Sequence, residues 1–298
     1  MRSLTRRHFL QTAGATAAAG CLGAPATIPA AVNDDAPKFQ LGIVTYNVAA
    51  KWDLPTVLKV LKDTKIGNVE FRTTHAHGVE PSLSSSQRQD VKKRCADAGI
   101  RIWGLGSVCE FQAPDKSVVE KNIEECKQFC GLAHDLGAKG VKVRPNGVPR
   151  NVPLEKTLEQ IGKSLIHCGK AAADAGVEIF VEVHGQTTQN PPNMKTIMEH
   201  CGHPAVGVCW NSNGTDVKGG SVAESFKMLS PWLKSCHIND LYKDEQGVYP
   251  YRELFRLMRG VGYDRVTLCE VGKTPGSVAD GTEMLRYYRA LWLELARG

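Results

Sequence analysis

The sequence lacks a Cys-x-x-Cys pair, a long hydrophobic run and, after Asp34, any linker or low-complexity tract. Without a Cys-x-x-Cys pair, a structural zinc ribbon is not indicated. Residues 12–31 are rich in alanine, but glycines and prolines interrupt them and they are only weakly hydrophobic, so we expect no stable membrane span. The roughly 265 residues that follow suit a single barrel or two small domains.

Acidic residues are also absent before Asp34. In this acid-free segment, residues 5–11 (TRRHFLQ) are close to the twin-arginine export pattern, and an Ala/Gly-rich stretch follows them. Ala24-Pro25-Ala26 fits a small-residue cleavage site, and the region ending at Ala31 fits less well. We therefore predict that residues 1–31 are a twin-arginine signal peptide. The protein is expected to be periplasmic or otherwise exported by this pathway.

The net charge is low for a nucleic-acid-binding protein. The formal net charge at pH 7 is +6, and it includes Arg2, Arg6 and Arg7 in the signal segment. Without these three arginines the charge falls to +3, and the remaining charges are scattered. We therefore expect no nucleic-acid partner. The sequence indicates no particular oligomeric state.

The ten cysteines form no evident disulfide framework. Cys21 lies in the signal segment, where a lipid anchor on it is the alternative to simple cleavage, although the leucine usual three residues earlier is missing. The other nine are an odd number. Cys209 and Cys236 lie in apolar strand segments, and Cys126 and Cys168 lie on apolar stripes of helices, so we interpret them as small buried hydrophobic residues.

Strand-like and helical segments alternate along the chain at a spacing of roughly 33 residues, the size of one strand with its crossover helix. Capping-box spacing places helix starts at Ser84, Ser117 and Asp280, and glycine follows several helical segments, as a left-handed C-cap favours. Strict alternation implies parallel strands and predicts an α/β fold, a single closed (β/α)8 TIM barrel. The predicted strands are residues 40–47, 68–72, 102–107, 140–145, 178–184, 206–211, 235–240 and 265–271.

Polar side chains interrupt the C-terminal ends of these apolar strands. Side chains alternate across a strand, so Glu182 and His184 face the same side as Phe180, the barrel interior. In a TIM barrel the functional site lies at the C-terminal ends of the strands, where these residues meet. The side chains expected there are Glu182, His184, Asn211, His237 and Glu270, with His75, His77, Lys142 and Arg144 from the second and fourth strands.

A family resemblance rests on five motifs, VEVHG, VGVCWNSN, CHIND, YPYRELFRLMRGVGY and LCEVG. On these motifs the chain resembles the xylose isomerase-like barrels, a family that includes sugar phosphate isomerases and epimerases and the ketose 3-epimerases. The resemblance extends from about Phe39 to the C-terminus. It implies a barrel domain over residues 36–298.

The resemblance also implies a metal site. In that family a divalent cation is held by Glu, Asp, His and Glu from the fifth to eighth strands, and the matching positions are Glu182, Asn211, His237 and Glu270. Asn211 stands where aspartate is usual; its amide oxygen can bind a hard cation, but with one carboxylate fewer the affinity should fall. The oxygen-rich set favours Mn or Mg over Zn as the cofactor. Gly214 replaces a substrate-binding histidine of the epimerases, so that contact does not carry over.

The function implied is a metal-dependent sugar isomerase or epimerase that removes a proton next to a carbonyl through an enediolate, with Glu182 and Glu270 as the catalytic pair. The partner would be a small-molecule carbohydrate. Two alternatives stay open. One is an exported 3-keto-glycoside lyase that uses the same metal and glutamates, and the other is a non-catalytic carbohydrate-binding barrel.

Substrate contacts are expected from His75, His77, Lys142, Arg144 and His184. Each of the first four has a simpler structural alternative. For the two histidines it is solvation in a loop, and for Lys142 and Arg144 it is a salt bridge with acids at the barrel mouth.

Overall fold

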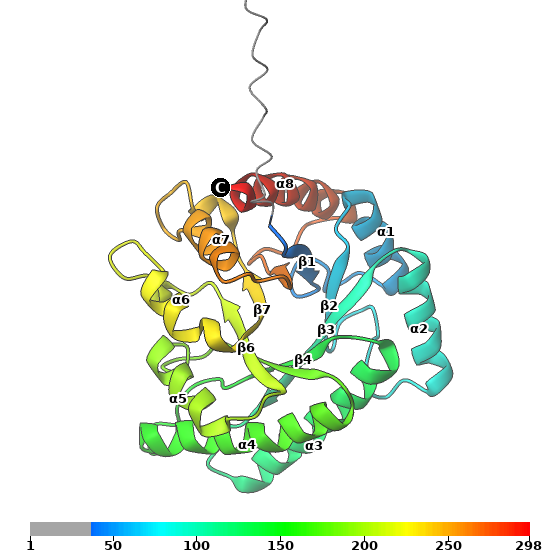
Figure 1. The fold of residues 1–298 in the computed structure, drawn as a ribbon. Coiled ribbons are helices and arrows are strands. Elements are labelled where there is room, and N and C mark those ends of the chain that lie inside the picture. Colours follow the sequence, from blue (N-terminus) through cyan, green and yellow to red (C-terminus); the bar gives the residue numbers. More distant parts are fainter. Residues whose placement is uncertain (1–36) are drawn as a thin grey trace, which may run out of the picture. The chain divides into compact units, whose positions relative to one another are not determined.

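A closed barrel of parallel strands forms the centre of residues 37–298, the part of the chain that the computed structural model describes (Figure 1). Each strand pairs with the next, and β1 pairs with β8 to close the ring. The prediction of a single (β/α)8 barrel is confirmed, and the predicted signal peptide lies outside the described residues. The strands are β1 Gln40–Val44, β2 Asn68–Arg72, β3 Arg101–Glu110, β4 Gly140–Arg144, β5 Glu178–Glu182, β6 Val206–Asn211, β7 Leu233–Ile238 and β8 Val266–Cys269.

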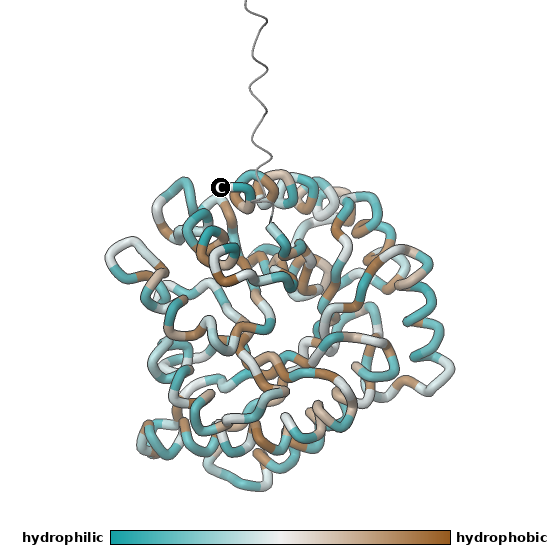
Figure 2. The backbone as a smooth tube through the Cα atoms, in the orientation of Figure 1, coloured by the Kyte–Doolittle hydropathy of each residue, from teal (hydrophilic) through white to brown (hydrophobic). Residues whose placement is uncertain are grey.

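One α-helix follows each strand and lies outside the barrel (Figure 1). Hydrophobic residues concentrate on the strands and on the barrel-facing sides of the helices (Figure 2). None of the helices in residues 37–298 combines the length and hydropathy needed to cross a bilayer. The helices are α1 Leu54–Thr64, α2 Ser85–Asp97, α3 Lys116–Leu136, α4 Leu154–Asp174, α5 Pro191–Cys201, α6 Ala223–Leu229, α7 Tyr251–Gly260 and α8 Val278–Arg297.

Two helix starts differ from the capping-box prediction. Ser84 caps α2 as predicted. The N-cap of α3 is Asp115, whose carboxylate accepts the Ser117 N–H. The N-cap of α8 is Ser277, whose hydroxyl accepts the Asp280 N–H. In both cases an oxygen-bearing side chain two or three residues earlier reaches the free N–H groups of the first turn.

Most of the strands end earlier than the ranges predicted from the sequence. The first ends at Val44, and Asn47, three residues later, takes a left-handed conformation with φ of 58°. The fifth ends at Glu182, so His184 lies in the loop that follows. The polar residues of the strand ends thus lie partly in loops, beyond the regular strand pairing.

Apolar side chains fill the interior of the barrel. The Trp103 and Phe180 rings stack at 5.8 Å between centroids, and the Trp103 indole N–H donates to Ser235 at 3.0 Å. Phe180 faces the interior as predicted and is fully buried. The cluster consists of Val44, Trp103, Phe180, Cys209, Val266 and Leu268. The residues of the predicted site therefore lie beyond this apolar layer, at the C-terminal ends of the strands.

The cysteines of the described chain are all free and buried, as predicted. Burial raises the pKa of Cys95 to about 12 and that of Cys201 to about 11. A thiol with such a pKa stays protonated and is a poor nucleophile. These cysteines fill space in the core.

A buried carboxyl group supports the loop after β6. Asp216 Oδ2 accepts the Asn213 N–H and the Tyr249 hydroxyl, each at 2.9 Å, and the Trp210 indole N–H donates to that hydroxyl. Oδ1 is buried without a partner in residues 37–298. Burial raises the pKa of Asp216 to about 7, although both hydrogen bonds lower it. The folded protein therefore favours the protonated acid below that pH.

This pKa predicts a pH-dependent stability. When the pKa of an acid is higher in the folded than in the unfolded state, the free energy of unfolding falls as pH rises from the unfolded pKa to the folded pKa. Asp216→Asn keeps the shape and removes the titration. We expect the wild type to lose about 2–3 kcal/mol of stability relative to this variant between pH 5 and pH 8. Chemical denaturation of both proteins at both pH values measures the difference, and equal pH profiles would contradict the assignment.

Candidate metal and substrate site

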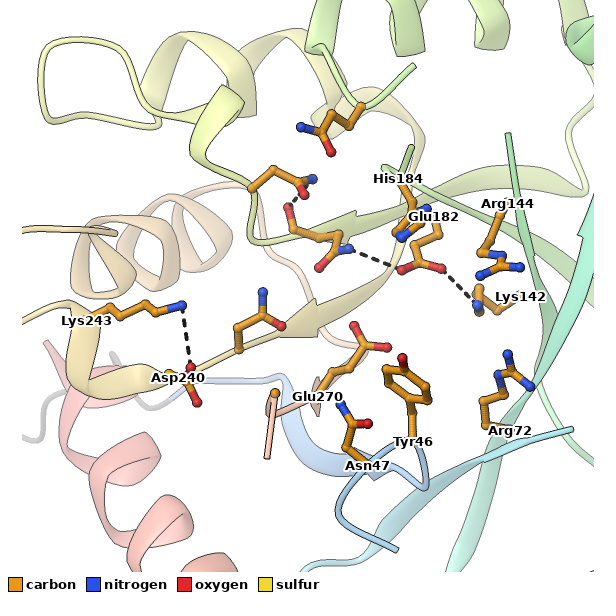
Figure 3. Close-up of a pocket in the computed structure, with 15 residues that line it drawn as sticks. Tyr46, Asn47, Arg72, Lys142, Arg144, Glu182, His184, Asp240, Lys243 and Glu270 are labelled. Atoms are coloured by element: carbon orange, nitrogen blue, oxygen red, sulfur yellow. Dashed lines mark hydrogen bonds and ion pairs between the residues drawn. The ribbon is translucent and has the colours of Figure 1, made fainter. Parts of the chain in front are cut away.

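A polar pocket of about 370 Å³ opens at the C-terminal end of the barrel (Figure 3). It contains six of the residues predicted from the sequence, Lys142, Arg144, Glu182, His184, Asn211 and Glu270. The other lining residues are Tyr46, Asn47, Arg72, Gln189, Asn213, Asn239, Asp240, Lys243 and Gly272.

Three of the four predicted metal ligands converge. One ligand atom from each of Glu182, His237 and Glu270 lies within 4.8 Å of the others. Nδ1 of His237 lies 3.2 Å from Oε2 of Glu270 and 3.7 Å from Oε1 of Glu182. These residues end β5, belong to β7 and follow β8, so the ends of three strands set their positions.

Asn211, the fourth predicted ligand, lies beside them at the end of β6. Its Nδ2 donates to Oε1 of Glu182 at 3.1 Å, and its Oδ1 is buried without a hydrogen-bond partner in the described chain. An amide oxygen in this state is an available donor for a hard cation. The four side chains therefore fit a divalent cation by the chemistry of their free atoms.

The charge of the cluster also favours a cation. Burial would lower the pKa of His237, but Cys209, Glu270 and Glu70 outweigh burial and raise that pKa well above its usual value. The acids around the ring thus stabilise positive charge at this point. A divalent cation would meet the same electrostatic field.

Lys142 is almost completely buried under the pocket and pairs with Glu182. Its Nζ lies 2.8 Å from Oε2 of Glu182, and this pair is visible in Figure 3. Burial raises the pKa of Glu182, but Lys142 and then His237 overcome it and hold that pKa well below its usual range. The salt-bridge alternative for Lys142 is therefore what the structure shows. The ammonium keeps Glu182 ionised and fixes its orientation.

Glu70 on β2 is a site residue that we did not predict from the sequence. Its side chain is completely buried, its Oε1 lies 3.2 Å from Nε2 of His237, and neither carboxylate oxygen has an aligned hydrogen bond in residues 37–298. Gly104 and Gly106 on β3 make room for it, since a Cβ at Gly106 would lie 3.0 Å from Oε1. With its Nδ1 toward Glu182 and Glu270, the imidazole presents its other nitrogen to Glu70.

The strand-alternation rule that found Glu182 could also have found Glu70. The segment NVEFR, residues 68–72, places a glutamate between two apolar side chains, as VEV does around Glu182. Glu70 and Arg72 share the inward-facing side of β2 by this rule. Arg72 lines the pocket and was also missed.

Two predicted substrate residues, His75 and His77, do not line the pocket. His77 is buried, its Nδ1 accepts the Val79 N–H, and its Nε2–H donates to the Arg72 carbonyl, both at 3.0 Å. Burial lowers its pKa to about 4, so the ring is neutral. Both nitrogens are thus used by the backbone of its own loop. The structure therefore does not bring His77 to the pocket, and its substrate role stays an untested prediction.

His75 also lies outside the pocket lining. Its ring stacks on Tyr46 at 6.3 Å between centroids, and its Nδ1 lies 3.2 Å from the Thr45 hydroxyl. It thus packs against Tyr46, a residue that lines the pocket. The third histidine predicted to contact substrate, His184, does line the pocket. Its Nδ1 is buried without a hydrogen-bond partner in the described residues.

Arg144 lines the pocket and at the same time makes the salt bridge that was its alternative. Its Nη2 donates to Oε1 of Glu110, the last residue of β3. Its Nε is buried without a partner in residues 37–298. The guanidinium therefore retains donors that are not used by the protein.

The comparisons with known proteins agree with this architecture. The family described as xylose isomerase-like TIM barrel matches residues 58–288, and the twin-arginine translocation pathway signal sequence matches residues 3–23. Because the family match covers most of the chain, the protein belongs to the xylose isomerase-like TIM barrel family. No curated protein sequence matches the chain significantly.

Solved structures share the fold at low sequence identity. The 3-keto-D-glucoside 4-epimerase YcjR from E. coli aligns with a TM-score of 0.70 at 14% identity, over 86% of this chain and 99% of its own. The D-psicose 3-epimerase from Clostridium cellulolyticum H10 gives 0.68 at 14%, over 87% and 96%. The IolI protein with a bound zinc atom gives 0.70 at 18%, over 87% and 98%.

The contact between Glu70 and His237 makes a testable prediction about cation binding. A carboxylate behind a ligating imidazole fixes the ring and its tautomer, and its loss typically weakens metal binding about 10–100-fold. We expect Glu70→Ala to lose this affinity for Mn²⁺ and Glu70→Gln, which keeps an acceptor oxygen, to lose less. Calorimetric titration with Mn²⁺ measures both. Equal affinity in wild type and Glu70→Ala would show that Glu70 only fills space.

Proposed function

We propose that the protein is a metal-dependent isomerase or epimerase that acts on a keto-sugar. The observation that carries this proposal is the convergence of Glu182, His237 and Glu270, with ligand atoms within 4.8 Å of one another at the C-terminal end of the barrel. The family match and the sugar epimerases among the proteins of similar fold support the choice of substrate class. The enzyme would act in the periplasm after export, as the signal-sequence match at residues 3–23 suggests.

The cation would be held by Glu182, Asn211, His237 and Glu270. Three of these four residues offer oxygen atoms, which suits Mn²⁺ or Mg²⁺ better than Zn²⁺. Such a cation supplies positive charge that stabilises the negative charge developing on the sugar oxygens when a neighbouring proton is removed.

Glu270 and Glu182 would transfer the protons. One carboxylate takes the proton from the carbon next to the carbonyl, the C–H electron pair moves toward the carbonyl oxygen, and an enediolate forms. Return of a proton to the former carbonyl carbon gives isomerisation. Return of a proton to the original carbon from the opposite face gives epimerisation. Both carboxylates face the centre of the pocket in Figure 3.

The two glutamates differ in their surroundings. Glu182 is held at one oxygen by Lys142 and at the other by Asn211, and its lowered pKa makes it a weak base. The Glu270 side chain is 16% exposed and contacts only His237 among the charged groups within ion-pair distance in residues 37–298. We therefore assign the first proton abstraction to Glu270.

A lyase acting on 3-keto-glycosides is the second candidate. The signal-sequence match favours it, because glycosides occur outside the cytoplasm and sugar phosphates seldom do. The same proton abstraction would begin the reaction. The electron pair of the enediolate would then break the bond to the glycosidic oxygen, whereas in the isomerase it takes up a proton at carbon. Residues 1–31 would be removed in either case, leaving the barrel of residues 36–298.

Replacing Asn211 tests its place in the cation site. Asn211→Asp exchanges a hydrogen-bond donor for a second carboxylate about 3 Å from Oε1 of Glu182. We expect Mn²⁺ affinity to rise, because a charge is added to the ligand set, and the melting temperature without added cation to fall through repulsion. Titration calorimetry and thermal melts with and without Mn²⁺ measure the two effects. Weaker Mn²⁺ binding by the variant would remove Asn211 from the ligand set.

Replacing the glutamates tests the chemistry. Glu270→Gln and Glu182→Gln keep the side-chain shape but cannot accept a proton, so each should lower turnover roughly 10²-fold or more, with the larger loss for Glu270. Glu159→Gln, on the exposed face of α4, is the matched control and should leave turnover unchanged. The assay follows ketoses and 3-keto-glycosides incubated in deuterated water.

The products distinguish the candidate functions. Deuterium at the reacting carbon of the product indicates isomerisation or epimerisation, whereas an unsaturated sugar with a released aglycone indicates elimination. If neither glutamate variant changes turnover, or if no tested keto-sugar exchanges its proton, the catalytic assignment is wrong. Sugar binding without reaction would then favour the carbohydrate-binding barrel.

A further inference from the structure

Arg72 is a cation in the pocket wall without an acidic partner. Its Nη1 donates to the Thr73 carbonyl at 2.8 Å and to the Thr74 hydroxyl at 3.2 Å, and within residues 37–298 it forms no ion pair. The acid of its own loop, Glu80, accepts instead from the Thr74 N–H and the Thr73 hydroxyl. Arg72 therefore lines the pocket without an acid in ion-pair contact among the described residues.

The other cations of the pocket are all paired. Lys142 lies 2.8 Å from Glu182, and Lys243 lies 3.4 Å from Asp240. Arg144 pairs with Glu110. Since pocket cations are otherwise matched to acids within the described chain, the unmatched guanidinium of Arg72 points to a partner that the protein does not supply.

Arg72 and Arg144 share one wall of the pocket. Figure 3 shows them extending from β2 and β4 toward the region of the Lys142 Nζ. Gly106 on β3 pairs with Arg72 of β2 on one side and with Lys142 of β4 on the other. Because glycine has no side chain, nothing from β3 stands between Arg72 and Lys142. Burial, and then the charge of Arg144, lower the pKa of Arg72, which places the two guanidinium groups in each other's field.

We propose that the substrate carries a negatively charged oxyacid group, which Arg72 and Arg144 bind while its carbonyl end faces Glu182 and Glu270. The proposal rests on the proposed function and narrows it to acidic keto-sugars. A guanidinium offers parallel N–H donors that match the oxygens of a carboxylate, sulfate or phosphate. Tyr46 supports this orientation, since the Arg72 guanidinium lies 5.8 Å from the centre of its ring.

The test measures by calorimetry how tightly the Mn²⁺-loaded mature protein binds four sugars. These are D-glucose, D-glucuronate, D-glucose 6-sulfate and D-glucose 6-phosphate. A hydrogen-bonded charge pair predicts about 10–100-fold tighter binding of an acidic sugar than of glucose. Arg72→Gln should abolish this difference. Arg101→Gln is the control, because it removes an arginine from the N-terminal end of β3, at the opposite end of the barrel, and should preserve the difference.

The ranking of the three acidic sugars identifies the oxyacid, and tighter binding of any of them that depends on Arg72 supports the proposal. Equal affinity for glucose and all three acids would overturn it. An acid preference that survives Arg72→Gln would also overturn it, because the anion would then bind the cation directly. The proposed function is tested separately by proton exchange of neutral and acidic ketoses in deuterated water. Absence of exchange in both kinds of ketose, with an intact Arg72-dependent preference, would reject the isomerase and keep the anion site.

Discussion

The burial of like charges at one end of the barrel is the constraint on which the site depends. Glu70, Glu182 and Glu270 surround His237, and Lys142 is the buried ammonium that offsets them. With His237 neutral, the form in which an imidazole ligates a cation, three carboxylates and one ammonium leave a formal charge of −2 for this group. Removing an ion from water costs several kcal/mol unless it is compensated. A divalent cation carries the charge that would balance the cluster.

The barrel tolerates this cluster because its strand ends fix the side chains from several directions. The register pairs Asn211 on β6 with His237 on β7, Glu182 ends the neighbouring β5, and β2 places Glu70 behind the imidazole. Below them the stacked rings of Trp103 and Phe180 close the interior with apolar contacts. The charges are thus held in a rigid layer with a dry floor, where electrostatic interactions are strong.

The sequence predicted the parts of this arrangement that follow from local periodicity. Alternation along a strand found Glu182, and strand-end placement found His237 and Glu270, because a parallel barrel brings all strand ends to one face. The pairing of Arg144 with Glu110 depends on side-chain reach between neighbouring strands, which periodicity does not describe. Periodicity also does not show that the ring of His77 turns away from the pocket and bonds to the backbone of Arg72 and Val79.

Asn211 determines how much negative charge the cluster carries. Its Nδ2 satisfies one oxygen of Glu182, and its Oδ1 remains a free buried acceptor. An aspartate here would raise the formal charge of the group to −3 and place two carboxylates about 3 Å apart. A barrel that bound sugars only through neutral contacts would be more stable with apolar residues at the buried positions of Glu70 and Glu182. Retention of these carboxylates, with an amide that limits their repulsion, therefore favours a site built to hold a divalent cation.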